Sequence, residues 1–147
     1  MPNKKVGTVL KLFISTKGTS QRTSKDFVIL DELGVNEDKF YNKNNERSVL
    51  ISCLDSYELT KKHNIEMPYG YLGENILLNY NPYHLDIGTK LYIGDCVLEI
   101  TQNCTICNHL AVIDESIPEL LKDDRGIFAK VIKDGKINIE DNVCLES

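Results

Sequence analysis

Hydrophobic and polar residues alternate along most of this 147-residue chain in the way that is typical of β-strands. The segments Val6–Ser15 and Asp26–Leu33 are rich in β-branched and aromatic side chains, so both are predicted to be strands. Short apolar strands are also predicted at Arg47–Ser52 and Glu74–Leu78. From Leu85 onward nearly every apolar segment has the strand pattern.

Two predicted helices and several glycine turns interrupt this pattern. Leucine and tyrosine recur near helical spacing in Leu54–His63, and a short helix is predicted near Pro118. Gly88 and Gly94 divide LDIGTKLYIGDCVLEITQ into three short strands, and Asp134–Gly135 predicts a hairpin between the last two apolar segments. So many short strands with frequent turns predict a mainly β fold, a barrel or a sandwich.

Composition narrows the class of protein. A chain of 147 residues, 41% hydrophobic and 27% charged, is expected to form one globular domain over residues 1–147. The net charge of −5 lacks the basic footprint of a nucleic-acid binder. The sequence shows no signal-peptide pattern and no apolar run of the roughly 18 residues needed to cross a bilayer. We therefore expect a cytoplasmic protein without nucleic-acid or membrane partners.

Five cysteines in a chain of this kind are expected to be reduced thiols. Cys53, Cys96 and Cys144 lie in or beside predicted strands and are interpreted as small buried side chains. Cys104 and Cys107 differ, because they follow a strand in the polar stretch TQNCTICNH. Loops carry functional residues more often than cores do, so this pair is the candidate for chemistry.

Three interpretations of the pair remain open from the residues alone. A thioredoxin-like redox pair would need a helix start in an α/β pattern, which the chain does not show. A zinc site needs four ligands, so His109 and one of His63 and His84 would have to complete it, although His63 and His84 are interpreted as structural. A single reactive thiol needs a cation or a helix start nearby to lower its pKa. Candidate cations for such a thiol are His109, Arg47 and Arg125.

Two weaker features complete the set. GENI (Gly73–Ile76) places a carboxylate and an amide before a strand, and DRGIF (Asp124–Phe128) places Arg125 before a glycine. Taken singly, each is typical of a turn with a solvated charge. The chain contains no P-loop, GxGxxG, HExxH or GxSxG motif, so those phosphate, dinucleotide, protease and hydrolase templates are not supported.

Taken in order, these motifs resemble the MOSC family, the domain named after the C-terminal part of molybdenum-cofactor sulfurase. GENI, LDIGTKLYIGDCVLEITQ, a cysteine five residues after the glutamine, and RGIFAKVIKDGKI follow the family's order and approximate spacing. Upstream, Gly34, Asp38 and Arg47 fill the family's glycine, aspartate and arginine positions, with Glu37 where a glycine is common. The resemblance implies a closed or partly open β-barrel with one to three peripheral helices.

The resemblance also singles out Cys107 as the signature cysteine. In this family that cysteine is thought to carry a persulfide in sulfur transfer or to ligate molybdenum in members that reduce N-hydroxylated compounds. A soft thiolate suits both tasks. The implied cofactor is molybdopterin, with Cys107 as the metal ligand and arginines that pair with an anionic phosphate. The residues implied to bind it are Arg47, Glu74, Asn75, His109 and Arg125.

Several functions follow from this resemblance. In a sulfur transferase, Cys107 would accept sulfur from a cysteine desulfurase and pass it on, with Cys104 as a resolving thiol. In a reductase, Cys107 would ligate the molybdenum of the cofactor. Molybdenum-cofactor enzymes are the other expected partners. A rival hypothesis is a non-catalytic module that stores or chaperones the pterin cofactor. A third is a small zinc-stabilised interaction domain. Exposed edge strands would make a homodimer unsurprising.

Overall fold

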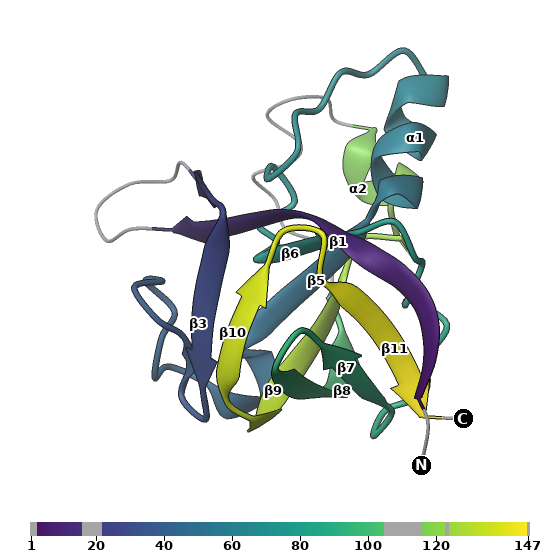
Figure 1. Ribbon diagram of the computed structural model, residues 1–147. Helices are drawn as coiled ribbons and strands as arrows, with labels where there is room; N and C mark the ends of the chain where they lie inside the picture. Colours follow the sequence, from purple (N-terminus) through teal and green to yellow (C-terminus); the bar gives the residue numbers. More distant parts are fainter. Residues whose placement is uncertain (1–2, 16–21, 105–115, 123, 147) are drawn as a thin grey trace.

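The computed structural model describes residues 3–15, 22–104, 116–122 and 124–146 of the chain (Figure 1). These residues form a mainly β structure with two α-helices and one 3-10 helix, η1. The strands are β1 (Asn3–Ser15), β2 (Arg22–Lys25), β3 (Phe27–Asp31), β4 (Gly34–Val35), β5 (Val49–Cys53), β6 (Ile76–Leu78), β7 (Lys90–Ile93), β8 (Cys96–Asn103), β9 (Ile127–Lys133), β10 (Gly135–Asn138) and β11 (Asn142–Glu146). The helical segments are η1 (Asn45–Arg47), α1 (Leu54–Lys62) and α2 (Ile117–Leu120).

Seven strands close into a barrel in the order β11-β7-β8-β9-β5-β6-β1, because the long first strand also pairs with the last one. Closure leaves no free edge among these seven strands, which removes the usual site of edge-to-edge aggregation. Neighbouring strands are antiparallel except β5 and β6, which are parallel. A parallel pair needs a crossover connection, and here the crossover contains α1 (Figure 1).

The alternation along β5 and β9 separates two environments. Val49, Ile51, Ile127 and Ala129 point into the barrel and join its main apolar core. Leu50 and Phe128, one residue out of phase, pack together on the outer face. Because successive side chains of a strand point to opposite faces, one short strand serves both the core and the outer face.

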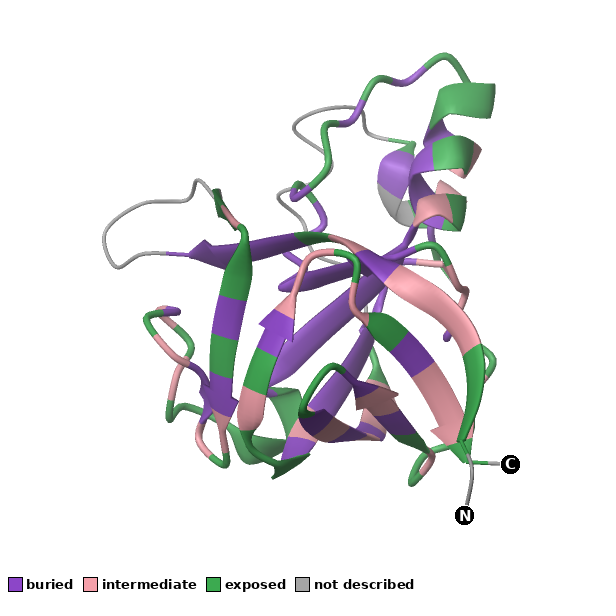
Figure 2. Cartoon of the chain, viewed as in Figure 1, coloured by how far each residue is buried: buried purple, intermediate pink, exposed green. Residues whose placement is uncertain are grey.

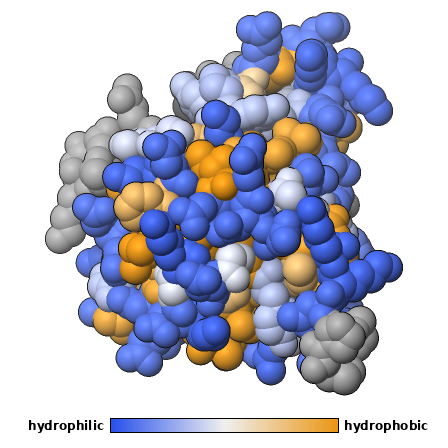
Figure 3. All heavy atoms as spheres, in the orientation of Figure 1, coloured by the Kyte–Doolittle hydropathy of each residue, from blue (hydrophilic) through white to orange (hydrophobic). Residues whose placement is uncertain are grey.

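A second, three-stranded sheet of the order β10-β3-β4 packs against the barrel. Its buried residues Val28, Leu30, Val35 and Ile137 belong to the main core. The bands of buried and exposed residues along β3 in Figure 2 follow the period of two that the sequence shows. The surface seen in Figure 3 is mostly hydrophilic, with apolar residues gathered in small patches.

The outer face beside β6 is covered by the helices. Tyr57 of α1 and Ile117 and Leu121 of the α2 region pack with Leu72 and Leu77 in a second apolar cluster. This layer positions the candidate site, because α1 and the chain between α1 and β6 lie directly over the β5–β6 pair (Figure 1).

The helix predicted at Leu54–His63 is confirmed as α1, and the short helix near Pro118 is confirmed as α2. The prediction of three strands between residues 85 and 102 is wrong, because only β7 and β8 form there. Gly88, at φ +94°, donates from its backbone N–H to the Ile100 carbonyl at 2.8 Å within a turn. The strand predicted from Arg47 begins at Val49, because Asn45–Arg47 form η1.

The hairpin predicted at Asp134–Gly135 is also wrong. The chain turns there, but β10 pairs with β3 and not with β9. The glycine is needed for a close approach instead: a Cβ on Gly135 would lie 2.7 Å from the Cβ of Asp95 and 3.1 Å from its carbonyl oxygen. The turn therefore connects β9 of the barrel to β10 of the three-stranded sheet.

Candidate functional site

The candidate site lies on the outer face of β8, β9, β5 and β6, at the end where β5 runs into α1. Cys104 follows β8, Arg125 precedes β9, and Glu74 and Asn75 precede β6. Pairing brings these three positions together, since Asn103 is opposite Ile127 and Ile51 is opposite both Ile127 and Ile76. The order of strands in the sheet thus unites motifs that lie 21 to 51 residues apart in sequence.

Cys104 is buried at the outer end of β8. Its backbone N–H donates to the Gly126 carbonyl at 2.9 Å, and its side chain packs with Leu50 and Phe128. Cys107 and His109, the predicted reactive thiol and its neighbour, lie outside the described residues. The described chain stops at Cys104, on the outer face, and resumes at Ser116, which precedes α2 in the helical layer.

Gly126 sets how closely β9 approaches β5 beside Cys104. A Cβ at this position would lie 3.0 Å from Leu50 Cδ1 and 3.3 Å from the Ile51 carbonyl oxygen. Its φ of +156° is also one that side chains disfavour. The glycine after Arg125 is thus explained by local packing.

Arg125 is a buried arginine, with 4% of its surface exposed. Its Nη1 donates to the Leu72 carbonyl at 2.6 Å, which ties the start of β9 to the loop before β6. Its Nε is buried and has no hydrogen-bond partner among the described residues. A buried donor without a partner destabilises the folded state, so a bound ligand with an acceptor atom could stabilise this nitrogen.

Glu74 is completely buried. Its Oε2 accepts hydrogen bonds from Ser52 Oγ at 2.8 Å and from the Tyr57 hydroxyl, whereas its Oε1 has no partner within the described part of the chain. Burial, followed by the charge of Glu74, raises the pKa of Tyr57 well above its usual value. The phenol therefore remains a donor to the carboxylate at neutral pH.

Asn75 connects three segments of the barrel wall. Its Oδ1 accepts from the Leu50 N–H at 3.1 Å, and its Nδ2 donates to the Phe13 carbonyl at 3.2 Å and to Asp38 Oδ1 at 3.3 Å. Asp38 in turn accepts from the N–H groups of Ser15 and Phe40. The upstream aspartate and the GEN motif are thus joined directly.

Arg47 differs from Arg125 in its exposure. It lies at the end of η1, where Asn44 caps the helix by accepting from the Glu46 N–H at 3.0 Å. Its guanidinium carbon stacks over the Phe128 ring at 4.5 Å from the centroid, so the charge remains exposed above the Leu50–Cys104–Phe128 cluster. The structure therefore gathers Glu74, Asn75 and Arg125 and places Arg47 on the same outer face.

The other thiols and histidines lie apart from this arrangement. Burial raises the pKa of Cys53 to about 11 and that of Cys96 to about 12, which agrees with inert structural thiols. His63 is at the C-terminal end of α1 with Nδ1 3.1 Å from the Leu59 carbonyl oxygen, and His84 lies beside Tyr80. In the described ranges no group of three His, Cys, Asp or Glu side chains could hold a metal ion.

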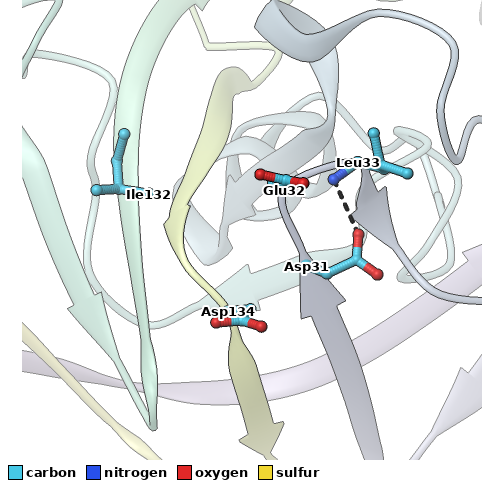
Figure 4. A pocket seen from close by; sticks show the side chains of 5 residues that line it. All are labelled: Asp31, Glu32, Leu33, Ile132 and Asp134. Atoms are coloured by element: carbon cyan, nitrogen blue, oxygen red, sulfur yellow. Dashed lines mark hydrogen bonds between the residues drawn. The ribbon is translucent and has the colours of Figure 1, made fainter.

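Sequence reasoning missed Ser52 and Tyr57, the two donors to Glu74. Nothing in the sequence marks them, because a buried hydroxyl partner is recognisable only once the strands and α1 are packed together. The pocket in Figure 4, of about 350 Å³, was also not foreseen. It is lined by Asp31, Glu32, Leu33, Ile132 and Asp134 and lies toward the opposite end of β9 from Arg125.

The model of the MOSC domain family matches residues 38–144, well over half of the chain. This protein belongs to the MOSC-domain family. The match spans every candidate residue of the site, from Arg47 to Arg125. Among curated proteins no sequence matches this chain.

Solved structures agree with the family and show the fold of this MOSC domain. YuaD from Bacillus subtilis has a TM-score of 0.82 at 14% identity, over 99% of this chain and 100% of that one. YiiM from Escherichia coli has a TM-score of 0.69 at 18% identity, over 95% of this chain and 70% of that one. YiiM from Geobacillus stearothermophilus has a TM-score of 0.67 at 13% identity, over 99% and 76%. The expected barrel with peripheral helices is thereby confirmed.

The described helices of this MOSC protein include none that is both long and apolar enough to span a bilayer.

Proposed function

We propose that this MOSC-domain protein uses the Cys107 thiol for sulfur transfer or for molybdenum-cofactor binding in molybdenum-cofactor metabolism. One observation carries the proposal: Arg125 and Glu74 are both buried, and each has a polar atom without a partner among the described residues. Arg125 binds Leu72 directly and Glu74 is linked to it through Tyr57, on the face where β8 ends at Cys104. Cys107 follows three residues later in the sequence. Buried charges with unused hydrogen-bonding capacity are typical of functional sites, because in other places they would only destabilise the fold.

In the sulfur-transfer form, Cys107 acts as a carrier. Its thiolate attacks the outer sulfur of a donor persulfide, the donor's S–S bond breaks, and the donor leaves as a thiolate. Cys107 then holds one extra sulfur, which a second thiolate acceptor removes by the same exchange, so no net oxidation occurs. A cation near the thiol favours the thiolate that this step needs, and the chain provides Arg47 and Arg125 on this face.

In the cofactor form, the same residues hold a pterin cofactor. Arg125 Nε, which has no partner in the described part of the chain, and the exposed guanidinium of Arg47 fit an anionic phosphate. Glu74 Oε1, which likewise has no described partner, fits a donor group. When bound, molybdenum would supply oxygen-atom or reductive chemistry, with Cys107 as its soft ligand. The side chain of Asn75 already has three partners within the protein, so its contribution would be to fix Glu74 and Asp38.

We place this activity in the cytoplasm, where thiols stay reduced, with a cysteine desulfurase or molybdenum-cofactor enzymes as partners. A homodimer is compatible with the proposal and is not required by it. His109 would support Cys107 as a neighbouring base or ligand.

The first test is the metal content of the purified full chain from cells able to make the molybdenum cofactor. Wild type, Cys107→Ser and Cys144→Ser would be compared, because Cys144 is a half-buried thiol of β11 with no assigned role. Molybdenum near one per chain that is lost only in Cys107→Ser supports the cofactor form. Molybdenum retained in Cys107→Ser would indicate the non-catalytic storage module instead.

The second test addresses sulfur transfer in the same three proteins. Each is incubated with glutathione persulfide, and peptide mass spectrometry locates any added sulfur. Sulfur on Cys107 in wild type and Cys144→Ser supports the carrier. No molybdenum and no sulfur on Cys107, together with stoichiometric zinc, would refute both forms and leave the zinc-stabilised domain.

A further inference from the structure

The hydroxyl of Tyr57 is the point at which the buried charged residues are joined. This hydroxyl donates to Glu74 Oε2 and lies within hydrogen-bonding distance of the N–H groups of Gly70, at 3.0 Å, and Leu72, at 3.5 Å. The carbonyl of the same Leu72 accepts from Arg125 Nη1 at 2.6 Å. A phenol can donate one hydrogen bond and accept two, so this oxygen is fully used. One atom thus links the carboxylate to the loop that holds the guanidinium.

The contacts of Glu74 are one-sided. Both of its described donors, Ser52 and Tyr57, bind Oε2, whereas Oε1 is buried without a partner among the described residues. On the other side of Leu72, Arg125 has the same asymmetry: Nη1 is bound, and Nε has no partner within the described ranges. The arrangement therefore leaves one acceptor and one donor available, both held in place through Tyr57.

We propose that Tyr57 is a positioning residue, which fixes Glu74 and, through Leu72, Arg125 for the chemistry at Cys107. The inference rests on the function proposed above. Tyr57 itself would not touch the sulfur or the cofactor. Tyr57 would affect the reaction through the Glu74 carboxylate, because the electrostatic effect of a buried charge depends on where that charge is held.

A purely structural tyrosine would have a different signature, and the chain offers one as a control. The hydroxyl of Tyr83 hydrogen-bonds the Cys53 N–H at 3.0 Å and Ser56 Oγ at 2.7 Å. Both tyrosines thus anchor α1, but none of the contacts of the Tyr83 hydroxyl is with Glu74 or Leu72 among the described residues. Tyr83→Phe should lose stability as Tyr57→Phe does, but it should leave the sulfur chemistry unchanged.

The experiment measures the initial rate of sulfur uptake by Cys107 from glutathione persulfide, together with the melting temperature. The full-length proteins are wild type, Tyr57→Phe, Tyr83→Phe, Glu74→Gln and the double variant Tyr57→Phe/Glu74→Gln. We expect both tyrosine variants to melt several degrees lower, because each loses more than one buried hydrogen bond. Only Tyr57→Phe should slow uptake, by about fivefold, the factor that one hydrogen bond is worth.

The double variant separates positioning from general destabilisation. If Tyr57 acts through Glu74, adding Tyr57→Phe to Glu74→Gln slows uptake no further, although stability still falls. Equal slowing in Tyr57→Phe and Tyr83→Phe, or additive slowing in the double variant, would overturn the inference while the proposed function stands. Wild-type protein that takes up no sulfur would overturn both.

Should Tyr57→Phe fail to fold, Ser52→Ala provides a second route, because it removes the other donor to Glu74 Oε2. An unchanged rate in Ser52→Ala would contradict the positioning of Glu74 through that oxygen. A slowed rate that Ser52→Thr restores would support it, since threonine keeps the hydroxyl.

Discussion

The interior of the barrel and the outer face beneath α1 are both buried, but the outer face adds buried charges to its apolar cluster. The barrel interior is apolar, with side chains such as Ile51, Leu98 and Ile127 at 0 to 1% exposure. The outer face buries Glu74 and Arg125, each with a polar atom that has no partner among the described residues. Apolar burial stabilises a fold, whereas burial of charges usually opposes it.

This difference separates two tasks within a small domain. The apolar interior stabilises the fold, and the outer face partly offsets this stabilisation. Incompletely paired buried charges lower the free energy of unfolding by several kcal/mol unless a ligand provides the missing hydrogen bonds. β5 serves both regions, with Ile51 in the interior and Leu50 and Ser52 on the outer face. A change on one face of this strand should therefore affect stability, and a change on the other should affect function.

The largest expected effect comes from the interior. Leu98→Ala removes a completely buried side chain from the middle of β8 and should lower the free energy of unfolding by about 3 kcal/mol. Urea denaturation followed by circular dichroism measures it, with Val97→Ala on the same strand as the half-buried control. Equal losses in the two variants would contradict the assignment of Leu98 to the core.

A somewhat smaller effect is expected where polar residues hold the outer face together. Asp38→Ala leaves the N–H groups of Ser15 and Phe40 without this acceptor and removes one of the two acceptors of the Asn75 amide. The free energy of unfolding should therefore fall by about 2 kcal/mol. Asp38→Asn keeps an acceptor oxygen and should lose less. If both variants are as stable as wild type in urea denaturation, Asp38 does not anchor this face.

The elements of the fold follow from local patterns. Alternating or continuous apolar side chains predict β1, β3, β5 and β9, and helical spacing predicts α1, because each depends on residues close in sequence. The pairing of β10 could not be predicted in this way. Asp134–Gly135 has the composition of a hairpin turn, but its glycine is required by the approach to Asp95, a residue 40 positions earlier in the chain.

The candidate site was predictable only in part, for the same reason. Glu74, Asn75 and Arg125 belong to recognisable motifs, and the structure brings them together. Arg125 is bound by the backbone carbonyl of Leu72, and Glu74 by the hydroxyls of Ser52 and Tyr57. Such groups occur throughout any sequence, so only packing of α1 over β5 and β6 identifies the ones that matter.

A third prediction concerns the point where the two regions meet. Gly126→Ala places a Cβ 3.0 Å from Leu50 Cδ1 and 3.3 Å from the Ile51 carbonyl, at a φ that alanine disfavours. We expect a loss of about 1.5 kcal/mol in the free energy of unfolding, since β5 and β9 must move apart. Gly88→Ala is the matched control, because its φ of +94° is also unfavourable but no atom lies within 4 Å. A larger loss in the control would show that backbone strain, and not crowding at Leu50, dominates.

The smallest expected effect has the opposite sign and concerns the loop that carries Asp38. Glu37 has a φ of +70°, a left-handed conformation that costs a side-chain-bearing residue about 1 kcal/mol and glycine almost nothing. Glu37→Gly should therefore raise the free energy of unfolding, by about 0.5 kcal/mol after the added freedom of the unfolded chain is subtracted. Glu58→Gly, on the exposed side of α1, should lower it by about 1 kcal/mol, since glycine is unfavourable within a helix. Thermal and urea denaturation of the two variants give the comparison directly. A loss of stability in Glu37→Gly would mean that the Glu37 side chain has a stabilising contact that outweighs the backbone strain.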